Sequence, residues 1–101
     1  MNRFEQLNSR VVAWADSKGI LEKATPLKQA EKTLEEAKEL VSAVDFDSVV
    51  DIVDALGDVM VTILIQAKMQ NLDLLDCLES ALDIIEKRTG KMIDGQFVKD
   101  K

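Results

Sequence analysis

Residues 48–70, SVVDIVDALGDVMVTILIQAKMQ, form the longest apolar stretch of this 101-residue chain. The apolar side chains cover nearly every face of an α-helix, a pattern typical of a helix buried among other elements. The exception is one narrow stripe at helical spacing, formed by Asp51, Asp54, Asp58 and Thr62. Buried carboxylates are costly unless they are paired, protonated or bound to a metal. The stripe is therefore either a thin solvent-facing strip or, as we favour, the floor of a cleft.

The segments on both sides of this stretch predict further helices. Thr25 and Pro26 are a good N-cap and first helical residue, and Leu27, Leu34 and Val41 then recur at helical spacing, as expected for a core-facing stripe. Near the end of the chain, Asp94-Gly95 suits a type I′ turn between two strands. The predicted fold is one all-α domain over residues 1–101, with helices at about 3–18, 26–43, 48–70 and 72–88 and a β-hairpin at about 91–98.

Composition excludes several classes of function. The net charge is −6 and there is no histidine, so the sequence predicts no unaided binding to nucleic acid and no Ser-His or Cys-His catalytic pair. The acidic residues inside the longest apolar stretch argue against a membrane span. Cys77 is the only cysteine, which excludes an internal disulfide and fits a reducing compartment, so we expect a cytoplasmic protein.

A second acidic cluster lies on the preceding helix, where Glu35, Glu36 and Glu39 are neighbours at spacings of three and four. This cluster alone is typical of a solvated helix face. If the two helices are antiparallel neighbours, however, both acidic clusters can face the same cleft. A site of carboxylates without histidine or thiolate suits Mg²⁺ or Mn²⁺.

Several other residues are candidate ligands of a substrate. Trp14 can stack on a base, although a single tryptophan on an apolar helix face more often belongs to the core. Basic side chains can neutralise a polyphosphate, or they are ordinary surface charges. The candidates for substrate binding are Trp14, Gln29, Arg88 and Lys91, with Lys32 as a further cation.

Two motifs resemble those of a known family. Residues 34–40, LEEAKEL, match the Glu-Glu-x-x-Glu motif of the MazG-like all-α nucleoside triphosphate pyrophosphohydrolases, and residues 54–58, DALGD, fall where that family has Glu-x-x-Asp. Residues 25–32 and 88–98 also look like those of short phage and bacterial members. The resemblance implies a MazG-like four-helix bundle that converts a nucleoside triphosphate to its monophosphate and pyrophosphate.

The resemblance also implies the metal ligands. The matching positions for Mg²⁺ are Glu36, Glu39 and Asp58. Position 55 is alanine where the family motif has glutamate, so Asp54 is the predicted fourth ligand, with Asp51 as the second choice.

The predicted catalytic residues are Glu35 and Lys32. Glu35 would orient or deprotonate the attacking water, and Lys32 and Lys91 would hold the outer phosphates. The alternatives are a weak or inactive MazG-like binding or regulatory oligomer, suggested by Ala55, and a purely structural helical oligomer.

The apolar content, 47% of the residues, exceeds what a four-helix monomer can cover, and a lone hairpin needs a surface to pack on. The sequence therefore predicts a homodimer or a dimer of dimers. It leaves open the base and sugar of the substrate, the number of metal ions, and the choice between dimer and tetramer.

Overall fold

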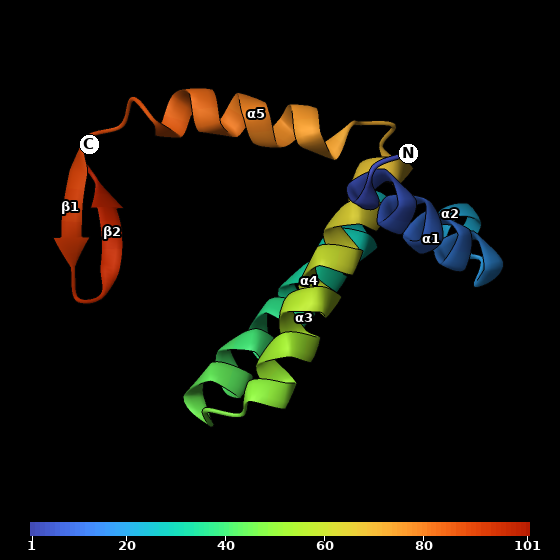
Figure 1. The fold of residues 1–101 in the computed structure, drawn as a ribbon, viewed down its shortest axis with the longest axis horizontal. Helices are drawn as coiled ribbons and strands as arrows, with labels where there is room; N and C mark the ends of the chain where they lie inside the picture. Colours follow the sequence, from blue (N-terminus) through green and yellow to red (C-terminus); the bar gives the residue numbers. More distant parts are fainter.

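The computed structural model describes residues 1–101 as five helices followed by a two-stranded sheet (Figure 1). The elements are α1 (Arg3–Ser17), α2 (Ile20–Lys23), α3 (Pro26–Asp45), α4 (Val49–Met69), α5 (Leu74–Ile85), β1 (Gly90–Ile93) and β2 (Gln96–Lys99). The four predicted helices and the hairpin are confirmed. The single turn α2 was not predicted: Gly19, at φ 76°, ends α1, and one more helical turn follows before Thr25.

Side-chain caps set the helix starts. The Thr25 hydroxyl accepts a hydrogen bond from the Lys28 amide at 3.2 Å, and Pro26 follows as the first helical residue. At the start of α4 the cap is Ser48, whose hydroxyl accepts from the Asp51 amide. Asp47, one residue earlier, adopts the left-handed conformation (φ 54°) where the chain reverses between α3 and α4.

Helices α3 and α4 form an antiparallel hairpin, and α1 crosses the second half of α4 (Figure 1). The contact between α3 and α4 buries small and polar residues, among them Gln29, Ala43, Ala55 and Thr62. Small side chains let the two helices approach closely. The acidic residues of both helices therefore lie at the edge of a tight interface.

The most apolar faces of the chain are not covered. The predicted core-facing stripe of α3 is solvent-exposed at Leu27, Leu34 and Val41, so this prediction is wrong for a single chain. The first half of α4 is also exposed, although its sequence predicts a buried helix. None of the helices combines the length and the apolar character needed to cross a membrane.

Beyond its first turn, α5 leads away from the other helices, and the hairpin lies farther still (Figure 1). The accessible surface is 8047 Å², whereas a compact 11.3 kDa monomer exposes about 5,700 Å². The radius of gyration is 15.8 Å, against about 12.7 Å for a compact chain of this length. The predicted four-helix bundle is thus not closed within one chain.

In the hairpin, β1 and β2 pair antiparallel with Met92 opposite Phe97. Asp94 (φ 50°) and Gly95 (φ 83°) both have positive φ, as the predicted type I′ turn requires.

Candidate metal centre

The α3–α4 hairpin brings together carboxylates from both acidic motifs. One oxygen from each of Glu36, Glu39 and Asp58 lies within 4.8 Å of the other two. Glu36 and Glu39 share a face of α3 because they are three residues apart, and α4 presents Asp58 beside them. We call these three residues the carboxylate cluster.

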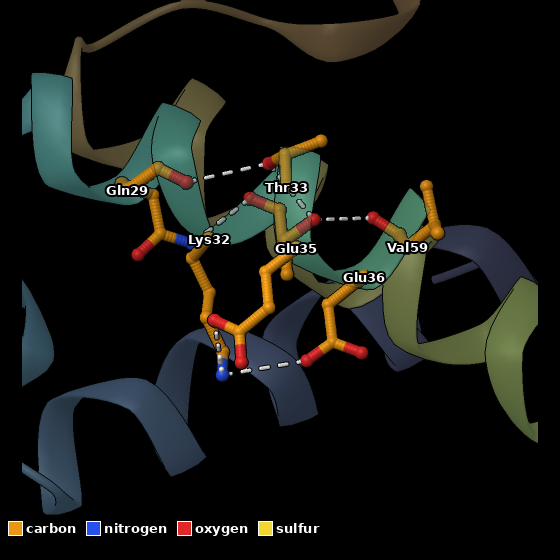
Figure 2. Close-up of polar contacts among 7 residues, drawn as sticks. Gln29, Lys32, Thr33, Glu35, Glu36 and Val59 are labelled. Atoms are coloured by element: carbon orange, nitrogen blue, oxygen red, sulfur yellow. Dashed lines mark hydrogen bonds and ion pairs between the residues drawn. The ribbon is translucent and has the colours of Figure 1, made fainter. Parts of the chain in front are cut away.

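Glu36 is the most buried member of the carboxylate cluster. Its side chain is only 12% exposed, and one of its oxygens forms an ion pair with the Lys32 ammonium at 3.4 Å (Figure 2). The other oxygen, Oε2, is buried and has no hydrogen-bond partner. A buried carboxylate oxygen without a partner is unfavourable, so this atom is suited to a cation.

The crowding of carboxylates changes the protonation of Glu39. A protonated Glu39 can share a hydrogen bond with Glu36, and this bond together with the negative charge of Glu36 raises the pKa of Glu39 above its ordinary value of 4.5. The direction of the shift shows that the ionised carboxylates repel one another. A bound cation would remove this repulsion.

The raised pKa of Glu39 predicts how stability depends on pH without metal. Just above pH 4.5 the folded protein holds a proton on Glu39 that the unfolded chain has lost, so the free energy of unfolding falls as the pH rises through the raised pKa. Glu39→Gln should remove this decline. Thermal unfolding in chelator from pH 4.5 upward, comparing wild type with Glu39→Gln, measures it. Parallel curves for the two proteins would contradict the expected repulsion.

The donor set of the carboxylate cluster fits a hard divalent cation. It offers only oxygen atoms, as Mg²⁺ and Mn²⁺ prefer. The Glu39 and Asp58 side chains are exposed, so both can move toward a cation beside Glu36. Such an ion supplies positive charge that polarises phosphoryl oxygens and water.

The two other candidate ligands lie beside the carboxylate cluster rather than in it. Asp51 and Asp54 line a cavity of about 390 Å³ together with Glu39 and Asp58, so both acidic motifs face one cleft, as the sequence predicts. Neither aspartate belongs to the group within 4.8 Å. Ala55 is 5% exposed and lines the same cavity, so the position where the family motif has glutamate adjoins the site.

A second cavity, of about 220 Å³, lies on the other side of the carboxylate cluster. Glu36 and Asp58 form one wall, and Trp14, Gln29 and Lys32 also line it. We call it the Trp14 cavity. Its remaining lining is mostly apolar and comes from α2 and α4: Ile20, Val61, Thr62 and Ile65.

Gln29 is held firmly in the Trp14 cavity. Its side chain is 6% exposed, and its Nε2 donates to the Thr62 carbonyl at 3.1 Å. Its Oε1 has no hydrogen-bond partner within the chain. Thr33 fixes the same region, because its hydroxyl lies 2.9 Å from that of Thr62. Gln29 therefore lines the cavity with a carboxamide whose Nε2 is already bonded to α4.

Of the other predicted site residues, one lies beside the carboxylate cluster and two lie far from it. Glu35 is an ion-pair partner of Lys32, at 3.2 Å, and this contact is the main reason that the pKa of Lys32 is raised. Arg88 and Lys91 follow α5 and line neither of the two cavities. In one chain the end of α5 and strand β1 lie far from the α3–α4 hairpin (Figure 1), so a contact of these two residues with the same site would need a second copy.

Sequence reasoning missed Thr33 and Ile20 as parts of this site. The alignment of Thr33 with Thr62 depends on the register of α3 against α4, which one sequence does not give. Ile20 reaches the cavity from the single turn that follows Gly19, and only the pair Lys18-Gly19 signalled a break there.

The fold and the carboxylate cluster define the class of protein: a mostly helical protein with a candidate divalent-cation site between two antiparallel helices. A model of the MazG nucleotide pyrophosphohydrolase domain matches residues 24–93, and the chain belongs to this family. Helices α1 and α2, which supply Trp14 and Ile20, precede the matched region.

One relative comes from a phage. An uncharacterized 18.2 kDa protein in the rep-hol intergenic region of Haemophilus phage HP1 is 36% identical over 73 residues, which is 72% of this chain and 45% of the phage protein. The chain therefore spans less than half the length of that relative. No solved structure matches the chain.

Proposed function

We propose that this protein hydrolyses a nucleoside triphosphate to its monophosphate and pyrophosphate, with Mg²⁺ or Mn²⁺ held by Glu36, Glu39 and Asp58. One observation carries the proposal: two members of the carboxylate cluster, Glu36 and Asp58, also form a wall of the Trp14 cavity. A ligand whose base occupies that cavity would extend its phosphates toward the cation. Family membership supports the same reaction.

The Trp14 cavity suits a base. Its volume of about 220 Å³ is below the roughly 300–1,000 Å³ of pockets for drug-sized ligands, as expected if it holds one part of a nucleotide. Trp14 is 49% exposed, which leaves its ring available for stacking. The free Oε1 of Gln29 can accept an N–H from the edge of the base.

The chemistry at phosphorus needs no protein nucleophile. A water oxygen bonds to the α-phosphorus, the bond from that phosphorus to the α,β-bridging oxygen breaks, and pyrophosphate leaves. Glu35 is the proposed group that orients this water or accepts its proton. The assignment of the α-phosphorus rests on the family, because the spacing of the carboxylates does not select one phosphorus atom.

The test is hydrolysis in ¹⁸O-labelled water with a panel of ribo- and deoxyribonucleoside triphosphates and Mg²⁺. We expect monophosphate and pyrophosphate in equal amounts, with the label on the monophosphate. Label in orthophosphate, with accumulation of diphosphate, would show that a different bond breaks. The panel would also identify the preferred base and sugar.

A second candidate is a MazG-like binding or regulatory oligomer with weak or no turnover. The observation that favours it is Ala55, because this position borders the site without supplying a carboxylate. In that case a nucleoside triphosphate would bind with Mg²⁺ in calorimetry, and the same panel would release no pyrophosphate.

We also propose that the chain works as a homodimer or a dimer of dimers. Its accessible surface exceeds that of a compact monomer by about 2,300 Å². Obligate dimers bury about 2,000–5,000 Å² in total, so an excess of this size on each chain is enough. The exposed apolar residues of α3, α4 and α5 supply a suitable surface.

A further inference from the structure

Lys32 has an unusual position, because its ammonium lies between two carboxylates beside the candidate metal centre (Figure 2). It is 3.2 Å from a Glu35 oxygen and 3.4 Å from a Glu36 oxygen. Glu35 is well exposed, whereas Glu36 belongs to the carboxylate cluster and is only 12% exposed. One cation thus bridges a surface carboxylate and a candidate metal ligand.

The contact with Glu36 matters for metal binding. A cation that binds the carboxylate cluster approaches the same carboxylate that Lys32 already neutralises, so the two positive charges repel each other. Lys32 can move away, because its side chain is 50% exposed and sits on a flexible stem. Lys32 also lines the Trp14 cavity, as Glu36 and Asp58 do.

We propose that Lys32 is an exchangeable counter-ion, which neutralises Glu36 in the metal-free protein and moves to the phosphates of the nucleotide when a divalent cation occupies the carboxylate cluster. The part that concerns phosphate rests on the proposed function. The part that concerns the metal depends only on the ion pair. Because one side chain serves both sites, metal and polyphosphate binding are coupled through it.

This exchange predicts that one substitution changes the affinities for metal and for polyphosphate in opposite directions. Lys32→Gln removes the competing charge, so Mn²⁺ should bind about three- to tenfold more tightly without nucleotide, the range expected for a partly exposed ion pair. The same variant loses a phosphate contact, so inorganic triphosphate should bind more weakly by a similar factor in saturating Mn²⁺. A residue that only stabilises α3 would not change the two affinities in opposite directions.

The experiment is calorimetric titration of the 101-residue chain, first with Mn²⁺ alone and then with inorganic triphosphate in saturating Mn²⁺. Lys28→Gln is the matched control, because Lys28 pairs with Glu31 at 3.2 Å one turn earlier on the same helix, and neither residue lines the two cavities beside the carboxylate cluster. Lys32→Arg keeps the charge and should retain near wild-type affinity for Mn²⁺. Circular dichroism confirms that each variant is folded.

The two arms separate the possible failures. Mn²⁺ affinity of Lys32→Gln equal to or weaker than that of Lys28→Gln would overturn the counter-ion role. Tighter Mn²⁺ binding with unchanged triphosphate affinity would overturn the exchange toward phosphate. The Mn²⁺ arm requires no hydrolysis, so a protein that turns over no nucleotide would refute the proposed function without deciding this inference.

Discussion

Asp58→Asn is expected to lower the turnover of a nucleoside triphosphate by about a thousandfold. Asp58 is the only member of the carboxylate cluster that α4 supplies, and its neutral amide replacement is a poor ligand for Mg²⁺. A divalent cation contributes several kcal/mol of charge stabilisation, and each 1.36 kcal/mol corresponds to a tenfold change in rate. Turnover under saturating Mg²⁺, measured by pyrophosphate release, tests this expectation.

The same variant should behave differently in a stability measurement. Removing one of three crowded carboxylates relieves repulsion, so metal-free Asp58→Asn should unfold at the same temperature as wild type or higher. Wild type should gain about 2.7 kcal/mol at a Mn²⁺ concentration of 100 times Kd, whereas the variant should gain little. Asp83→Asn on α5 is the control, because it removes one negative charge outside the carboxylate cluster. Unchanged turnover in Asp58→Asn would rule out the proposed metal site.

The sequence predicts the helices well because local chemistry determines where they begin and end. Thr25 and Pro26 start α3 as expected, and Asp73 caps α5 by accepting from the Leu75 and Asp76 amides. Asp94-Gly95 likewise makes the expected turn. These signals act over a few residues and need no knowledge of the tertiary structure.

The partner of each helix face could not be predicted in the same way. Leu27, Leu34 and Val41 do share one face of α3, but that face is exposed, and α4 packs instead on the face with Gln29 and Ala43. Periodicity identifies residues on a common face without identifying what covers them. In this chain the apolar stripe of α3 remains available to another chain.

The candidate site also combines features that the sequence predicts with contacts that it does not predict. The spacing of Glu36 and Glu39, and the position of Asp58 in its motif, predict carboxylates that the structure brings together. The Gln29 carboxamide was a candidate from the sequence, but its locked orientation depends on the Thr62 carbonyl of another helix. Such contacts depend on helix register, which the motif alone does not provide.

Leu78→Asp on α5 is expected to have the largest effect on assembly. Leu75, Leu78, Leu82 and Ile85 recur at helical spacing, and all four are more than 40% exposed in the single chain. In an oligomer this face would be buried, and an unpaired charge there would cost several kcal/mol. We expect the dissociation constant to rise by about a thousandfold. Light scattering at micromolar concentration should find wild type as a dimer or larger and the variant at 11.3 kDa.

Ser80→Asp is the matched control for Leu78→Asp, because it adds the same charge to the polar face of α5, which also carries Asp76, Glu79 and Asp83. It should leave the oligomer intact.

A wild-type mass of 11.3 kDa at micromolar concentration would contradict assembly itself. An intact Leu78→Asp oligomer would place the interface elsewhere, on the exposed faces of α3 and α4. A variant that dissociates and also loses turnover would indicate that a second copy completes the site, as a role for Arg88 or Lys91 requires.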